Sequence, residues 1–224
     1  MQIDYNHWEN ILRRSAASFG IVLSDQQIRQ FLIHGEELQR WTRRTNLTAI
    51  KEVEEIAIKH FIDSIAPSIY FEPMHDVLDI GSGGGFPGLP LKVLYPHIHL
   101  TLIDAVRKKA SFLKHMVRLI AVKDTDVIHG RVEALSTRHE MALFDTIISR
   151  AYSNITIILK NALPLLKPGG QILIWKGPSP DNEIKAANAV IERQRRLLTL
   201  KVRPYALPEI SAQRTLIAIH ASDV

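Results

Sequence analysis

A short glycine-rich segment is the part of this sequence best suited to hold a ligand. Five of the eight residues from Gly81 to Gly88 are glycine, and Asp79 stands just before them. Glycine adopts positive φ without strain and lets another molecule approach the backbone closely. A Gly-x-Gly-x-x-Gly spacing, which runs from Gly83 to Gly88, follows an apolar run and precedes a helical pattern, the context in which this spacing is informative. The segment predicts a ligand-binding turn at the carboxyl end of a strand.

Polar residues also follow the second and third apolar runs of this part of the chain. Their types and spacing suggest that the ligand contains a nucleoside. Asp104 lies 23 residues after Gly81, the distance at which a carboxylate accepts hydrogen bonds from a ribose diol. An acid at this place argues against a ribose 2′-phosphate. In α/β sheets that bind a nucleoside at this edge, the loop after the third apolar run borders the adenine. We therefore expect Val132 to form part of its apolar wall and Glu133 to meet its exocyclic amine.

Two ligands remain possible for this turn. A dehydrogenase seats the pyrophosphate of a nicotinamide cofactor on the following helix N-terminus. A methyltransferase instead passes Gly81 and Gly83 under the methionine and ribose parts of S-adenosylmethionine, with Asp79 near the ammonium group. Pro87 lacks the N–H that would donate to a phosphate, although its fixed φ suits a first helical turn. This favours S-adenosylmethionine.

Apolar runs alternate with helical patterns after about residue 71, which predicts a parallel sheet covered on both faces by helices. The runs are 77–80, 100–103, 127–128, 146–148 and 171–175, and the helical patterns between them are 89–94, 107–122, 132–135 and 155–166. Two further runs, 197–202 and 216–220, have no long helix between them and should pair antiparallel at an edge. We therefore expect a class I, Rossmann-like α/β methyltransferase fold. Its seven-stranded sheet should be mostly parallel, with an antiparallel C-terminal edge.

The first 70 residues are expected to be helical. Apolar residues recur there at three-, four- and seven-residue offsets, and a second helical stretch runs from Ile50 to Tyr70. Ser24 and Gln27 have the spacing of a capping box. The domain organisation predicted is an N-terminal helical extension, residues 1–70, and a methyltransferase domain, residues 71–224.

Composition narrows the class of protein. The chain has 224 residues, 46% of them hydrophobic, a net charge of +5 and no cysteine. Disulfides, thiolate metal sites and cysteine nucleophiles are therefore excluded. We expect no metal site, because the histidines lack metal-binding spacing. No apolar run is long enough to cross a bilayer and no secretory signal is recognisable, so we expect a cytoplasmic protein with no membrane partner.

Several longer motifs resemble one family, the bacterial small-subunit ribosomal RNA guanine-N7 methyltransferases (RsmG, also called GidB). The matching segments are Thr45-Asn46-Leu47-Thr48, Lys59-His60-Phe61-Ile62-Asp63-Ser64, Gly85-Phe86-Pro87-Gly88-Leu89-Pro90-Leu91, Arg131-Val132-Glu133, Ile148-Ser149-Arg150-Ala151-Tyr152 and Trp175-Lys176-Gly177. The resemblance implies a methylated guanine in 16S ribosomal RNA, within an assembling or intact small subunit. It implies S-adenosylmethionine contacts at Gly81, Phe86, Asp104, Val132, Glu133 and Arg150.

The chemistry agrees with this resemblance. Guanine N7 carries a lone pair and no proton, so its methylation needs positioning rather than a general base. We identify no certain catalytic residue. Arg150 and Lys176 are the positioning candidates, and Asn46, His60 and Lys176 are expected to contact the substrate. A non-catalytic ribosome-associated binding module on the same fold remains a third possibility.

Three basic groups are candidates for contacts with RNA phosphates. Each could equally be a solvated helix face. They are Arg40, Arg43 and Arg44 around Trp41, then the helix that follows Asp104 (Arg107, Lys108, Lys109, Lys114, Arg118 and Lys123), and last Arg193, Arg195, Arg196, Lys201 and Arg203 near the tail.

Overall fold

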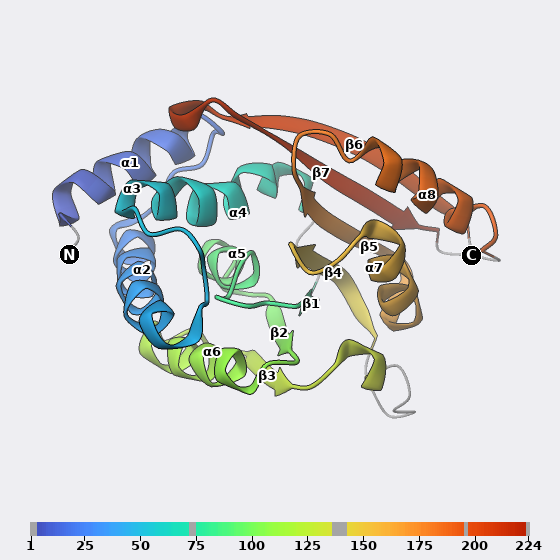
Figure 1. The fold of residues 1–224 in the computed structure, drawn as a ribbon, viewed down its shortest axis with the longest axis horizontal. Helices are drawn as coiled ribbons and strands as arrows, with labels where there is room; N and C mark the ends of the chain where they lie inside the picture. The colour runs from blue at the N-terminus through green and yellow to red at the C-terminus, as the bar shows by residue number, and fades with distance from the viewer. Residues whose placement is uncertain (1–3, 72–74, 136–142, 195–196, 223–224) are drawn as a thin grey trace.

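A seven-stranded sheet organises the protein (Figure 1). The computed structural model describes residues 4–71, 75–135, 143–194 and 197–222. The strand order is β3-β2-β1-β4-β5-β7-β6, and β7 runs antiparallel to both of its neighbours while the other pairs are parallel. The strands are β1 (Asp76–Ile80), β2 (His99–Asp104), β3 (Thr125–His129), β4 (Phe144–Arg150), β5 (Leu166–Lys176), β6 (Leu198–Leu207) and β7 (Ala212–Ala221). The predicted sheet, with its antiparallel C-terminal edge, is confirmed.

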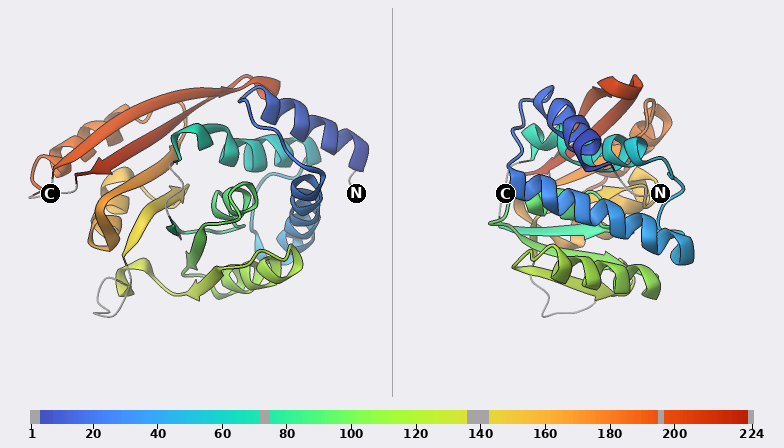
Figure 2. Two further views of the ribbon diagram at one scale, coloured as in Figure 1. Left: turned by 180° about the vertical axis from the view of Figure 1, so that it is seen from behind. Right: turned by 90° about the vertical axis from the view of Figure 1, so that its left-hand side faces the viewer.

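Helices cover both faces of this sheet, and each face has its own apolar core (Figures 1 and 2). On one face lie α1 (Tyr5–Ala17), α2 (Asp25–Thr45), α5 (Gly88–Leu94) and α6 (Arg107–Leu119). On the other lie α7 (Ile155–Ala162) and α8 (Asp181–Ile191). Short 3₁₀ turns complete the chain at η3 (Val132–Ala134), η4 (Leu163–Leu165) and η5 (Pro208–Ile210).

The N-terminal region is helical as expected, with one irregular segment. The predicted capping box is present: the Ser24 hydroxyl accepts from the Gln27 N–H, and the Gln27 side chain accepts from the Ser24 N–H. The stretch expected to start at Ile50 starts at Val53 instead. It comprises α3 (Val53–Ile56), the π-helix η1 (Ala57–Ile62), α4 (Asp63–Ile65) and the 3₁₀ helix η2 (Ala66–Tyr70). Such π-helical insertions are often found at functional sites.

The N-terminal helices share their core with the sheet. The Phe61 ring lies 5.3 Å from the Trp8 ring and 5.1 Å from the Phe86 ring, so it joins α1 to the glycine segment. All three aromatic side chains are at least 95% buried. The extension therefore completes one face of the sheet.

The structure also contains elements that the sequence pattern did not predict. The helix α8 was not predicted, although Ile184, Ala187 and Ile191 recur on one of its faces and pack against the core. The expected helix at 132–135 is a single 3₁₀ turn, η3. Arg195 and Arg196, from the third basic group, lie outside the described residues. Within the described ranges, no helix combines the length and apolarity needed to traverse a bilayer.

Candidate functional site

A cavity of about 280 Å³ lies at the carboxyl ends of β1, β2 and β4. Ligands bind at this edge of open α/β sheets. The structure brings together here four residues singled out in the sequence, namely Gly81, Asp104, Val132 and Glu133. Ala151 and Tyr152, from the loop after β4, also line it.

Asp104 joins the glycine turn to the second strand. Its Oδ2 accepts from the Gly83 N–H at 3.0 Å and its Oδ1 from the Val106 N–H at 2.8 Å. The Gly81 N–H donates to the Ile103 carbonyl at 2.9 Å, so the backbone is held as well. A carboxylate has about four lone-pair sites, which leaves Asp104 able to accept from a ligand. Gly83 supports the cavity without lining it.

Gly81 allows the close approach of the loop after β4. Its φ is +73°, and a Cβ there would lie 2.5 Å from Tyr152 Cδ2. On the other side of the same contact, Ala151 has φ +54°, a conformation that L-residues rarely adopt. Backbone strain of this kind concentrates at ligand-binding sites.

Asp79 lies beneath the glycine segment and does not line the cavity. The side chain is fully buried, and its Oδ2 accepts from the Gly88 N–H at 3.0 Å. Its Oδ1 has no hydrogen-bond partner among the described residues. Burial raises the pKa of this carboxyl to about 7. The described contacts of Asp79 thus fix the start of α5, and its expected proximity to a ligand ammonium stays a prediction.

Phe86 lies between two histidines. The His34 and His60 rings both stack on it with centroids 4.7 Å away. His34 donates from Nε2 to the Gly84 carbonyl at 2.8 Å, and burial lowers its pKa to about 4. Phe86 is 5% exposed and does not line the cavity. Its ring supports the glycine segment from the side of the buried core.

Arg150 is held by the N-terminal extension. Its Nη1 lies 3.1 Å from Asp63 Oδ2, and its Nη2 lies 3.0 Å from His60 Nδ1. Because a guanidinium can only donate, His60 Nδ1 accepts and His60 Nε2 carries the proton that it gives to Thr48 Oγ1. Burial, and next the charge of Arg150, lower the pKa of His60. The structure brings Arg150 and His60 together, but places neither in the lining of the cavity.

Sequence reasoning missed the importance of Asp63. Besides Arg150, its carboxylate binds the Tyr205 hydroxyl at 2.8 Å and lies 3.6 Å from Arg214 Nε. Its carbonyl accepts from Trp175 Nε1 at 2.9 Å. One buried acid thus connects α4 to four strands, β4 to β7. Its sequence signal was its place in the Lys59-His60-Phe61-Ile62-Asp63-Ser64 segment, which gives no indication of its partners.

The remaining predicted residues lie elsewhere. Lys176 Nζ is 2.7 Å from both the Ser153 carbonyl and Glu183 Oε2, so it ties the loop after β4 to α8. Asn46 ends α2 with φ 49° and lines a separate, open cavity of about 790 Å³ together with Thr48. The predicted contacts of Lys176 and Asn46 with the substrate stay predictions.

Comparison with solved structures identifies the fold. An O-methyltransferase from Bacillus cereus in complex with SAH superimposes with a TM-score of 0.64, covering 96% of this chain and 99% of that one at 14% identity. An O-methyltransferase from Streptomyces achromogenes, solved in complex with SAM, gives 0.63 with 98% and 99% coverage, also at 14% identity. Together with the strand order, these likenesses define a class I methyltransferase fold.

Sequence comparison identifies the family. The family model described as GidB, rRNA small subunit methyltransferase G, matches residues 27–216. A Ribosomal RNA small subunit methyltransferase G from Geobacter sulfurreducens is 41% identical over 93% of this chain and 95% of the relative. One from Roseiflexus castenholzii is 37% identical over 93% and 89%. The chain belongs to the rRNA small subunit methyltransferase G family, which confirms the resemblance described above.

Proposed function

We propose that this protein transfers a methyl group from S-adenosylmethionine to N7 of a guanine in 16S ribosomal RNA. The observation that carries the proposal is the cavity where Gly81 and the Asp104 carboxylate meet, in a chain of this family. The particle acted on is an assembling or intact small subunit in the cytoplasm.

The residues at the cavity fit an adenosyl group. Asp104 has free lone pairs for a ribose diol, and the backbone at Gly81 lines the same cavity. Val132, 3% exposed, offers an apolar surface to a purine, and Glu133 lies beside it. When bound, S-adenosylmethionine supplies a methyl group on a positively charged sulfur.

Methylation at guanine N7 needs no general acid or base from the protein. The N7 lone pair forms the new N–CH₃ bond while the S–CH₃ bond breaks and its electrons return to sulfur. The positive charge passes from the sulfonium to the guanine ring, and no proton moves. Correct placement of two reactants can supply roughly 7–11 kcal/mol of the barrier reduction. Arg150 and Lys176, both fixed by ion pairs, act as positioning residues that hold the loop after β4.

The test is mass spectrometry of ribosomal RNA nucleosides from cells with and without this protein. We expect one 7-methylguanosine in the small-subunit RNA to disappear in its absence. The purified protein should then restore it on small subunits from the deficient cells, using methyl-labelled S-adenosylmethionine.

Other results would identify the alternatives. Calorimetry that shows NADH binding without S-adenosylmethionine binding would favour the dehydrogenase. Binding to small subunits without methyl transfer would favour the non-catalytic module, and label found only in protein would overturn the RNA assignment.

A further inference from the structure

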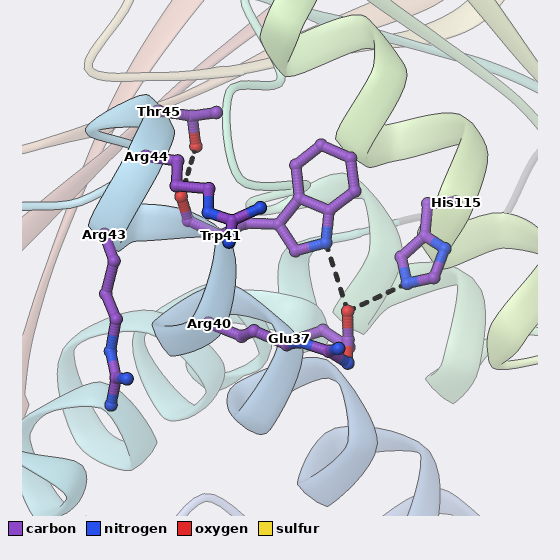
Figure 3. Close-up of a pocket in the computed structure, with 7 residues that line it drawn as sticks. All are labelled: Glu37, Arg40, Trp41, Arg43, Arg44, Thr45 and His115. Atoms are coloured by element: carbon purple, nitrogen blue, oxygen red, sulfur yellow. Dashed lines mark hydrogen bonds and ion pairs between the residues drawn. The ribbon is translucent and has the colours of Figure 1, made fainter.

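A second cavity, of about 570 Å³, opens between the end of α2 and the middle of α6 (Figure 3). Three arginines, a tryptophan and a histidine line it, with one carboxylate among them. The arginines are Arg40, Arg43 and Arg44. This basic–aromatic pocket, as we call it, has no part in the site described above.

The carboxylate, Glu37, organises the pocket. It accepts hydrogen bonds from Trp41 Nε1 at 3.1 Å, from His115 Nε2 at 2.8 Å and from Arg40 Nη1 at 3.1 Å, as the dashed lines in Figure 3 show for the first two. The Trp41 ring also contacts the rings of Phe112 and His115, each with centroids 5.5 Å away. The indole is therefore held in one position by both polar and apolar contacts.

Arg43 and Arg44 are exposed and make no ion pair or hydrogen bond through their guanidinium groups within the described part of the chain. Figure 3 shows both side chains extending from the last turn of α2. Basic residues at a helix C-terminus favour the helix dipole. Figure 3 shows Arg43 extending away from the Trp41 ring. Two unpaired guanidinium groups and a fixed aromatic ring that line one pocket suit a ligand that carries phosphates and flat bases.

The pocket lies close to the candidate active site along two helices. On α2, His34 and Leu38 lie against the glycine segment at Gly84, and Glu37, between them in the chain, already lines the pocket. On α6, Lys109 lines the first cavity and His115 lines the pocket. Six helical residues span roughly 9 Å. A nucleic-acid strand whose target base lies at the mouth of the first cavity, beside the bound cofactor, would therefore reach the pocket with its neighbouring nucleotides.

We propose that the basic–aromatic pocket binds the ribosomal RNA strand next to the target guanine. Arg43 and Arg44 contact its phosphates, and Trp41 stacks on an unpaired base. Arginine pairs with phosphate in bidentate fashion, and aromatic side chains stack on bases that are not in a helix. In A-form RNA a deep, narrow groove hides N7, so the target and its neighbours must be unstacked. This inference rests on the proposed function, because it names how that site holds its RNA.

The test compares two double variants of the full chain. Arg43→Ala/Arg44→Ala removes the two free charges of the pocket, and Lys160→Ala/Lys185→Ala removes two exposed charges on α7 and α8, at the opposite side of the molecule (Figure 1). Small subunits from deficient cells are the probe for both binding and methyl transfer. For the arginine variant we expect KM for the subunits to rise about tenfold or more, because two charge-assisted hydrogen bonds are removed. We expect kcat and affinity for S-adenosylmethionine to stay as in the wild type.

Salt dependence separates a phosphate contact from a structural effect. The slope of log Kd against log salt should shrink by about two in the arginine variant, roughly one for each phosphate that is no longer neutralised, and stay constant in the lysine variant. Trp41→Leu should weaken binding without changing the slope. The docking site is overturned if the arginine variant keeps the wild-type KM and slope, or if the lysine variant is weakened as much. Wild-type protein that transfers no label to RNA would instead overturn the proposed function, while the slopes would still decide whether RNA docks here.

Discussion

At the residue scale, two buried carboxylates at the same sheet edge have different environments. Asp104 borders the cavity and accepts two backbone hydrogen bonds. Asp79 is fully buried, one of its oxygens has no partner in the described structure, and its pKa is raised by burial. Asp104 is suited to bind a polar ligand, whereas Asp79, with a pKa of about 7, changes its charge near neutral pH inside the fold.

Asp104→Asn should weaken binding of S-adenosylhomocysteine by about tenfold or more, since the amide nitrogen cannot accept from either a ribose hydroxyl or a backbone N–H. Calorimetry with the natural ligand and with its 2′,3′-dideoxy analogue separates the two effects in a double-mutant cycle. If Asp104 binds the diol, removing the hydroxyls weakens binding to the wild type but not to the variant. Equal weakening in both proteins would show that Asp104 acts only on the glycine turn.

Asp79→Asn should change how stability depends on pH. The folded-state pKa of Asp79 is about 7, above the ordinary value of 3.8, so the folded state binds an extra proton between these values. Stability therefore falls as pH rises through this window, and the neutral amide avoids that loss. Between pH 5 and pH 8 we expect the free energy of unfolding of the variant to gain roughly 2–3 kcal/mol relative to the wild type. Urea unfolding at both pH values measures this, and a constant difference would show that the carboxyl is ionised throughout.

At the scale of elements, the irregular stretch from η1 to η2 is attached to the sheet through Asp63. The Arg150 and Asp63 side chains are 13% and 7% exposed, so their ion pair is largely shielded from water. The same guanidinium orients His60, which stacks on Phe86 behind the glycine segment. The π-helical turn places His60 and Asp63 so that one arginine reaches both.

Asp63→Asn should destabilise the protein by about 3 kcal/mol, because it leaves a buried guanidinium without its counter-ion. Asp126→Asn is the matched control, since Asp126 forms an exposed pair with His99 and should lose less than about 1 kcal/mol. Urea unfolding of the two variants gives the comparison. Similar losses in both would mean that the Asp63 network adds nothing beyond a surface pair.

At the scale of the whole molecule, we propose that residues 1–70 are an extension of the methyltransferase domain, residues 71–224, and not a second domain. The core on one face of the sheet contains Trp8, Phe31 and Phe61 from the extension together with Leu89 and Phe112 from the helices that cover the sheet. Removing the extension would expose this face to water.

The full chain should therefore unfold in a single transition. Variants that keep only Trp8 or only Trp175 report on the extension and on β5 respectively, and their fluorescence should change at the same urea concentration as the circular dichroism. The fragment 71–224 alone should not unfold cooperatively. Two separated transitions, or a cooperative fragment, would contradict a shared core.

The sequence alone determined the sheet, the glycine turn and four of the residues that line the cavity. These depend on local information: apolar periodicity, glycine spacing, and acids placed at the ends of strands that must meet at one edge. The Ser24 capping box was equally readable because its partners are three residues apart.

Only the tertiary structure decided which charged side chains form ion pairs and hydrogen bonds within the protein. Arg150 binds Asp63, which lies 87 residues earlier in the chain, and the Tyr205 hydroxyl binds the same carboxylate from 142 residues away. Lys176 similarly pairs with Glu183 on α8, a helix missing from the predicted elements. A charged residue can be recognised in a motif, but its partner depends on how distant elements pack. A charge that is buried in this packing needs a partner, because burying an unpaired charge has a high free-energy cost.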